Sequence, residues 1–175
     1  MEYTKKELGK KVLETAYLTG HFVLRSGKTS NYYLDKYLFE TQPEILKAIA
    51  REMGKMLPAG QYDRLAGPEL GAIALVTAVG MEVNSPFLFV KKATKGYGTD
   101  KLIEGKFNKG ERIIIIEDIL TTGGASLEAA KTLQAAGLKV ECIIGVIDRE
   151  QGAQQTVTEA GFKLMSLFTK TELGI

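Results

Sequence analysis

The chain has 175 residues, of which 45% are hydrophobic and 25% charged, with a formal net charge of +2. This length suits one compact domain with a substantial core. The small net charge gives no support for a global nucleic-acid-binding surface, so any positive site must be local. The longest uncharged apolar run, Leu70 to Met81, is shorter than the roughly 20 residues that span a bilayer. Because the first residues, MEYTKKELGKKV, carry charges where a signal peptide needs an apolar stretch, we expect a cytoplasmic protein.

The first forty residues predict a helix followed by two short strands. Thr4 and Glu7 have the spacing of a capping box, and apolar residues from Leu8 to Ala16 recur at helical intervals. Gly20 is placed to end this helix. The runs HFVLR and YYLDKYLF then favour two strands on either side of the turn-like sequence SGKTSN.

From Pro43 onward, helices alternate with apolar strands. The expected strands cover residues 62–67, 86–90, 112–118, 140–148 and 162–168, and the expected helices cover about 43–56, 71–79, 127–136 and 153–160. The run RIIIIED lacks any polar alternation, which indicates a strand buried on both faces. This pattern is typical of a parallel α/β sheet covered by helices on both sides. The single cysteine, Cys142, falls in one of these strands and is expected in the core.

The most informative segment runs from Ile113 to Ser126, with the sequence IIIIEDILTTGGAS. An apolar strand leads into the acidic pair Glu117 and Asp118, then into a small, flexible turn and a helix. Ligands of open α/β sheets bind beyond the carboxyl ends of the strands, so this turn is expected to face a site. Its glycines allow close backbone approach, its hydroxyl groups add donors, and the helix N-terminus adds unpaired N–H groups. The turn therefore predicts a phosphate-binding site.

The acidic pair next to this turn needs a separate explanation. Two carboxylates would repel a phosphate unless they had another task, and hydrogen bonding to the vicinal hydroxyls of a ribose is such a task. Ribose 5-phosphate would satisfy both halves of the motif. The pattern alone leaves an ordinary strand–turn–helix equally open, because glycine-rich turns are common. The dinucleotide fingerprint G-x-G-x-x-G and the Walker P-loop are both absent from the sequence.

The segment IIIIEDILTTGGAS resembles the phosphoribosyl pyrophosphate signature of type I phosphoribosyltransferases: a hydrophobic run, two acidic residues, two variable residues and T-[TA]-G-[GTS]. Further blocks, in the same order along the chain, narrow the resemblance to orotate phosphoribosyltransferases. FVLRSGKTSNYYLD resembles F-x-L-[KR]-S-G-x-x-S-x-x-Y, and VIDRE resembles V-x-D-R-x-[QE]. VKKATKGYGTDKLIEG resembles the family's lid, V-R-K-x-x-K-x-[HY]-G-x-x-x-x-[IV]-E-G.

The resemblance covers nearly the whole chain and implies an α/β, type I phosphoribosyltransferase fold in a single domain, residues 1–175. Its twisted, mostly parallel sheet would be flanked by helices, with a small hood formed by N-terminal segments, about residues 1–40. The implied reaction transfers the phosphoribosyl group of phosphoribosyl pyrophosphate (PRPP) to orotate, giving orotidine 5′-phosphate and pyrophosphate in pyrimidine biosynthesis. The implied cofactor is Mg²⁺, held mainly by the substrate and with no protein ligand assigned.

The lid, about residues 91–110, can also be interpreted from its composition. It contains four glycines and the lysines Lys91, Lys92, Lys95, Lys101, Lys106 and Lys109. A structureless loop this long in a compact domain is usually functional, and its lysines would stabilise pyrophosphate as it leaves. A solvated surface loop is the simpler interpretation without the resemblance. In the family, the lid reaches into the neighbouring subunit's site, which implies a homodimer.

The resemblance assigns roles residue by residue. Lys95 and Asp118 are implied to be catalytic. The residues implied to bind PRPP are Arg25, Lys91, Lys92, Lys95, Tyr97, Glu117, Asp118, Ile119, Leu120, Thr121, Thr122, Gly123, Gly124 and Ala125. The residues implied to bind orotate are Tyr33, Leu34, Thr121 and Arg149. The Arg149 guanidinium can hold a carboxylate with two hydrogen bonds, although its position alone also allows a surface ion pair with Asp148 or Glu150.

Two positions depart from the family pattern. Lys91 stands where the family usually has arginine, which keeps the charge but loses the two-pronged geometry. The turn from Gly67 to Gly71 lacks the lysine that some members carry there, so only backbone contacts are expected from it.

Two alternative functions are a regulator and a purine enzyme. A nucleotide-sensing regulator on the same fold is expected to add a nucleic-acid-binding element or to lose lid residues, and this sequence shows neither change. A purine phosphoribosyltransferase is disfavoured by Arg149 and by the YYLD segment.

Overall fold

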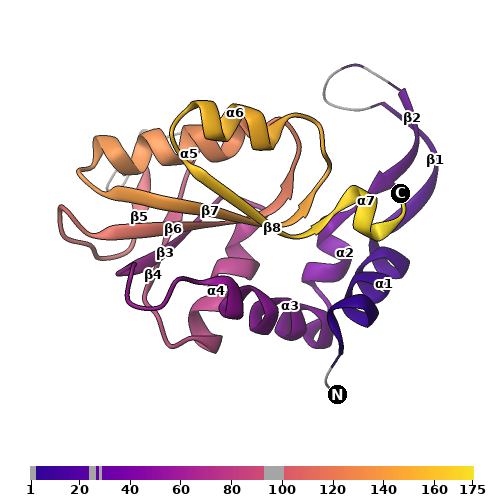
Figure 1. The fold of residues 1–175 in the computed structure, drawn as a ribbon, viewed down its shortest axis with the longest axis horizontal. Coiled ribbons are helices and arrows are strands. Elements are labelled where there is room, and N and C mark those ends of the chain that lie inside the picture. The colour runs from indigo at the N-terminus through magenta and orange to yellow at the C-terminus, as the bar shows by residue number, and fades with distance from the viewer. Residues whose placement is uncertain (1–2, 24–26, 28, 93–100) are drawn as a thin grey trace.

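The computed structural model describes residues 3–23, 27, 29–92 and 101–175 (Figure 1). In chain order, the helices are α1 Lys5–Ala16, α2 Lys36–Glu40, α3 Pro43–Met56, α4 Ala72–Glu82, α5 Gly124–Ala135, α6 Ala153–Glu159 and α7 Lys170–Leu173. The strands are β1 Tyr17–Val23, β2 Thr29–Leu34, β3 Arg64–Pro68, β4 Phe87–Val90, β5 Ile103–Glu104, β6 Arg112–Leu120, β7 Lys139–Asp148 and β8 Lys163–Thr169. Within these ranges, no helix is long and apolar enough to cross a membrane.

The central sheet has the strand order β5-β4-β3-β6-β7-β8. All neighbouring pairs are parallel except β4 with β5, which is antiparallel. Each parallel step requires a crossover, and helices α4, α5 and α6 supply crossovers between successive strands. The expected mostly parallel α/β sheet is therefore confirmed.

Helices cover both faces of this sheet (Figure 1). Strand β6 shows why, because its isoleucines alternate between two separate clusters of buried side chains. Ile114 and Ile116 pack with the side chains of α3 and α4, whereas Ile113 and Ile115 pack with those of α5 and α6. Cys142 is buried in the first cluster, as expected, and burial raises the pKa of its thiol. The uninterrupted apolar run therefore reflects a strand with no solvent-facing side.

The N-terminal elements stand apart from the sheet. Within the described part of the chain, β1 and β2 pair only with each other, in an antiparallel hairpin at the end of the molecule that also holds α1 and α2 (Figure 1). Thr4 and Glu7 form the predicted capping box at the start of α1. The prediction that Gly20 ends this helix is wrong, because α1 ends at Ala16 and β1 begins at Tyr17.

The predicted strand YYLDKYLF is also only half correct. Strand β2 stops at Leu34, and the Asp35 carboxylate accepts a 3.1 Å hydrogen bond from the Tyr37 amide, which begins the short helix α2. Asparagine, aspartate and serine favour this capping position because they satisfy an N–H group that has no partner in the helix. The cap thus turns the segment after residue 35 toward the sheet.

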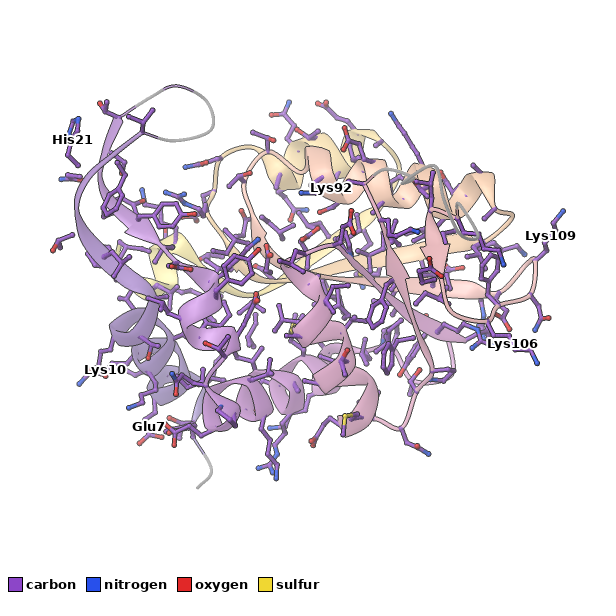
Figure 2. All side chains as sticks on the ribbon, turned by 180° about the vertical axis from the view of Figure 1, so that it is seen from behind. Glu7, Lys10, His21, Lys92, Lys106 and Lys109 are labelled. Atoms are coloured by element: carbon purple, nitrogen blue, oxygen red, sulfur yellow. The ribbon has the colours of Figure 1, made fainter. Side chains whose placement is uncertain are left out.

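The segment expected as one long lid is divided in the structure. Residues 93–100, with Lys95 and Tyr97, lie outside the described residues. Beyond them, β5 pairs with β4, and the Lys91 amide donates to the Leu102 carbonyl at 2.8 Å. Lys109 then packs against Gly137, before β7, and Figure 2 shows Lys106 and Lys109 at one end of the molecule, away from Lys92. Lys106 and Lys109 therefore lie apart from Lys92, because the chain has already turned back toward the start of β6.

Candidate active site

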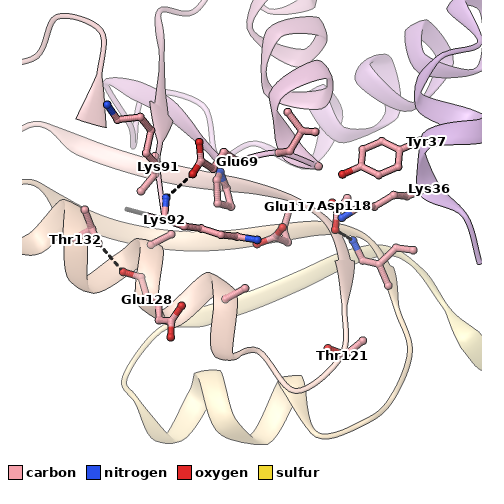
Figure 3. A pocket seen from close by; sticks show the side chains of 17 residues that line it. Lys36, Tyr37, Glu69, Lys91, Lys92, Glu117, Asp118, Thr121, Glu128 and Thr132 are labelled. Carbon is pink, nitrogen blue, oxygen red and sulfur yellow. Dashed lines mark hydrogen bonds and ion pairs between the residues drawn. The ribbon is translucent and has the colours of Figure 1, made fainter. Parts of the chain in front are cut away.

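The candidate site lies where the chain connections of the sheet diverge. Strand β3 continues through α4 to β4 on one side, whereas β6 continues through α5 to β7 on the other. A crevice opens at the carboxyl ends of strands at such a switch point. A pocket of about 300 Å³ is found there, between the turn after β3 and the end of β6 (Figure 3). Of the residues predicted to bind PRPP, the pocket is lined by Lys91, Lys92, Glu117, Asp118, Ile119, Thr121 and Ala125.

The acidic pair closes the inner end of this pocket. Glu117 is 6% exposed and Asp118 4% exposed. Glu117 Oε2 accepts a 2.9 Å hydrogen bond from the Ser126 hydroxyl, while burial and the neighbouring Asp118 raise the pKa of Glu117. Asp118 has partners on both oxygens, since Oδ1 accepts from the Ile119 amide and Oδ2 from the Lys36 ammonium. The two carboxyl groups thus differ, because only Asp118 has a cationic partner among the described residues.

The turn after β6 has the geometry of a phosphate cradle. Gly123 has a φ of 82°, and a β-carbon there would lie 2.9 Å from Val157, so this position requires glycine. Gly123 caps α5 without a side-chain hydrogen bond. The N–H groups of Gly124 and Ala125 at the helix N-terminus therefore remain available to an anion. Ser126 was expected to add a hydroxyl to the cradle, but this is wrong, because Ser126 is 2% exposed and its hydroxyl donates to Glu117.

The two lid lysines that line the pocket behave differently (Figure 3). The Lys91 ammonium donates a 2.8 Å hydrogen bond to Glu104 Oε1 on β5, and this contact lowers the pKa of Glu104. Lys91 accordingly points away from the acidic pair, whereas the Lys92 side chain points into the pocket. The Lys92 amide donates to Glu69 Oε1 at 2.8 Å, which ties the turn after β3 to the end of β4.

Arg149 follows β7, next to the glycine-rich turn. Its amide donates to the Leu120 carbonyl at 2.9 Å, so the main chain holds it beside Thr121. The side chain is 9% exposed, donates a 3.2 Å hydrogen bond to the Tyr32 hydroxyl, and leaves its Nε without a partner. No ion pair with Asp148 or Glu150 occurs in the described ranges; Asp148 instead accepts from the Glu150 amide. Arg149 is thus a buried cation with unused hydrogen-bonding capacity.

The remaining predicted residues are placed as follows. Tyr33 is 42% exposed on the hairpin, with its ring 5.6 Å from that of Phe22. Leu34 and Leu120 are buried in the core, so their side chains are not open to the pocket. Thr122 is exposed in the turn itself. The predictions for Arg25, Lys95 and Tyr97 fall outside the described residues.

Sequence reasoning missed three residues of helix α2 that the fold brings to the site. Lys36 and Tyr37 line the pocket, and Lys36 is the ion-pair partner of Asp118. Glu40 is 4% exposed and its Oε1 has no hydrogen-bond partner. Burial, reinforced by Asp118, raises the pKa of Glu40 to about 8. The available signal was Asp35, whose capping role would have identified 36–40 as helix rather than strand.

The described residues set limits on a metal site. Among them, no three His, Cys, Asp or Glu side chains converge closely enough to hold a metal ion. The pocket nevertheless offers the hard carboxylate oxygens that Mg²⁺ accepts. Because Mg²⁺ usually keeps several waters and takes one or two carboxylates plus substrate phosphates, these residues fit an ion that arrives with a phosphorylated substrate.

The strand order, with an acidic pair and a glycine-rich turn at the switch point, defines a type I phosphoribosyltransferase. No family model matches the chain. It is 46% identical over 154 residues to the orotate phosphoribosyltransferase of Methanocella arvoryzae, covering 88% of this chain and 87% of that one. It is 43% identical over 173 residues to that of Pyrococcus abyssi, covering 97% and 94%. The chain belongs to the orotate phosphoribosyltransferase family.

A solved structure agrees with this assignment. The Mycobacterium tuberculosis orotate phosphoribosyltransferase in complex with PRPP is similar in fold, with a TM-score of 0.81 at 27% identity. The match covers 98% of this chain and 99% of that chain.

Proposed function

We propose that this protein transfers the phosphoribosyl group of PRPP to orotate, giving orotidine 5′-phosphate and pyrophosphate in pyrimidine biosynthesis. The observation that carries the proposal is the position of Arg149 directly beside the phosphate cradle, buried and without an ion-pair partner in the described part of the chain. Orotate has a carboxylate that a guanidinium binds with two hydrogen bonds, whereas purine bases have none. The family assignment points to the same substrate.

In this proposal, each wall of the pocket holds one part of PRPP. The 5-phosphate lies in the turn from Thr121 to Ala125. There the glycines leave room for its oxygens, and the N–H groups of the helix N-terminus donate hydrogen bonds to them. The ribose hydroxyls donate to the acidic pair at the end of β6. The diphosphate then lies toward Lys92 and the turn after β3, on the opposite wall.

The reaction needs no covalent intermediate with the protein. As the bond from C1 to the diphosphate breaks, positive charge develops on the ribose, the orotate ring nitrogen attacks C1, and the proton of that nitrogen passes to the departing pyrophosphate or to water. Carboxylates next to the ribose stabilise this positive charge, and lysines next to the diphosphate stabilise the negative charge of the leaving group. Mg²⁺, when bound, neutralises part of the diphosphate charge, with Asp118 or Glu117 as the protein groups able to contribute an oxygen. Arg149, with Tyr33 and Thr121, orients the base.

A homodimer with a shared lid is part of the proposal. An apolar groove of about 500 Å³ lies between α2, α3 and α4, and exposed Leu70 and Met81 line it. Tyr37 and Leu70 line both this groove and the pocket, so a second copy seated in the groove would lie beside the site. From there it could supply Lys95 of its own lid to the leaving pyrophosphate. The cytoplasmic location expected from the sequence stays a prediction.

The experiment that tests the proposed function follows orotate absorbance. Absorbance should fall only when PRPP and magnesium are both present. Conversion of adenine or hypoxanthine with orotate untouched would instead identify a purine enzyme. If PRPP binds but neither type of base is consumed, the regulator is the better interpretation.

A further inference from the structure

Lys36 occupies Oδ2 of Asp118, and both residues line the pocket. Its ammonium reaches from α2 in the hood to Asp118 Oδ2 at the end of β6, 82 positions away in the chain. The Lys36 side chain is 28% exposed and that of Asp118 only 5% exposed. The Lys36 ammonium also lies 5.4 Å from the centre of the Tyr37 ring, a second favourable contact. The Lys36 ammonium is therefore held in place on the pocket wall by Asp118 and the Tyr37 ring.

The backbone of Gly71 restricts access to the same oxygen. A β-carbon built on Gly71 would overlap Asp118 Oδ2 and the Lys36 ammonium, and would lie 2.8 Å from Lys36 Cε. Oδ1 of Asp118 already accepts from the Ile119 amide. With Gly71 on one side and Lys36 on another, Oδ2 has little room for a further donor. A ribose hydroxyl that binds this oxygen would have to displace Lys36.

The nearby carboxylates would not capture the displaced ammonium. Glu117 is bonded to Ser126, Glu69 to the Lys92 amide, and Glu104 to Lys91. Glu40 has a raised pKa of about 8, so at neutral pH it is mostly uncharged. The turn from Glu69 to Gly71 lies directly against Lys36 and lines the pocket with it. An anion placed at this turn is the remaining partner.

We infer that Lys36 exchanges partners when substrate binds: it leaves Asp118 to the ribose hydroxyls and binds the diphosphate beside the 69–71 turn. This inference rests on the proposed function, since it takes PRPP as the ligand. The exchange keeps the buried Asp118 paired in the absence of substrate, and it provides a cation for the diphosphate when substrate binds. Lys36 is then a substrate-binding residue, contributed by the hood rather than by the lid.

The test compares the two halves of the substrate as separate ligands. Pyrophosphate and ribose 5-phosphate are titrated calorimetrically into the wild type, Lys36→Met and Lys36→Arg at pH 7, where Glu40 is mostly uncharged. Lys36→Met should bind pyrophosphate about ten- to a hundredfold more weakly, the effect of losing one charge-assisted contact. It should bind ribose 5-phosphate at least as tightly as the wild type, because Asp118 no longer has a competing partner. Lys36→Arg should retain most pyrophosphate binding.

Lys47→Met serves as the matched control, because Lys47 is an exposed lysine on α3 outside the pocket. It should leave both affinities unchanged. If Lys36→Met weakens both ligands equally, or neither, the exchange is wrong and Lys36 is only a counter-ion of Asp118. A wild type that binds neither ligand would instead defeat the proposed function.

A second measurement avoids removing the charge. The ¹³Cε signal of Lys36 in the wild type, assigned by its loss in Lys36→Arg, should shift when either ligand is added, for two different reasons. Ribose 5-phosphate displaces the ammonium, whereas pyrophosphate binds it. A signal that does not respond to pyrophosphate would overturn the inference even if Lys36→Met fails to fold.

Discussion

The Ser126 hydroxyl, in the first turn of α5, donates a 2.9 Å hydrogen bond to Glu117 Oε2 at the end of β6. Both residues are almost fully buried. The bond spans the base of the glycine-rich turn, so it joins the strand to the helix that the turn separates. The shape of the proposed phosphate cradle therefore depends on a side-chain contact beneath it.

Ser126→Ala should destabilise the protein by about 1–3 kcal/mol, the cost of leaving a buried acceptor without its donor. The loss should grow with pH. Burial and Asp118 already raise the pKa of Glu117, and removing the Ser126 hydroxyl, whose hydrogen bond lowers that pKa, should raise it further. A protein whose carboxyl group has a raised folded-state pKa loses stability as pH rises through that range. Urea unfolding at pH 5 and pH 8 measures both effects, with Ser85→Ala, whose hydroxyl contacts no carboxylate, as the control. Equal losses at the two pH values would contradict this account.

Glu40→Gln should stabilise the protein at pH 8 and have a much smaller effect at pH 5. Glu40 has a folded pKa of about 8, above the ordinary value of 4.5, because it is buried. Between these values the unfolded chain releases the proton first, so the wild type loses stability as pH rises and the neutral variant does not. The expected gain between the two pH values is on the order of 1–3 kcal/mol. Glu44→Gln, at an exposed position on α3, is the matched control in the same unfolding series.

Asp118→Asn should lower kcat/KM for PRPP by about ten- to a hundredfold, because an amide oxygen replaces a charge-assisted acceptor for the ribose hydroxyls. Its fold should remain intact, since the amide can still accept from the Ile119 N–H. Initial rates of orotate consumption at varied PRPP give the comparison. Unchanged kinetics would mean that the acidic pair is not at the ribose.

Arg149→Lys should lower kcat/KM for orotate and leave kcat/KM for PRPP unchanged. A lysine keeps the charge but cannot form two parallel hydrogen bonds with a carboxylate, so kcat/KM for orotate should fall about ten- to a hundredfold. Tyr32→Phe removes only the hydroxyl that accepts from Arg149, and its effect should stay within about tenfold. Equal losses for both substrates in Arg149→Lys would place Arg149 away from the base.

Mixing two variants of reduced activity tests whether the lid is shared between subunits. Lys95→Ala should lose about a hundred- to a thousandfold in kcat, as expected for one donor to a developing charge. Combined with Asp118→Asn under conditions of subunit exchange, a lid acting in trans gives heterodimers with one intact site. Activity should then recover to at most about half per heterodimer. No recovery in demonstrated heterodimers would reject the shared site and leave the enzyme assignment unaffected.

The features that depend on residues close together in the sequence could be predicted from the sequence. The run RIIIIED indicates a strand buried on both faces because it offers no polar side to solvent, and the structure confirms it. The acidic pair and the glycine-rich turn follow this strand directly, so their place at the carboxyl edge of the sheet required no long-range information. The motif blocks likewise identified the family.

Only the tertiary structure decided which distant residues meet these motifs. The YYLDKYLF run favours a strand locally, but the Asp35 cap and packing against α1 and α3 turn residues 36–40 into a helix that brings Lys36 to Asp118. The raised pKa of Glu40 and the pairing of Lys91 with Glu104 arise in the same way. Charge and solvation depend on what surrounds a group in space, and residues far apart in the chain acquire common surroundings only when the core forms.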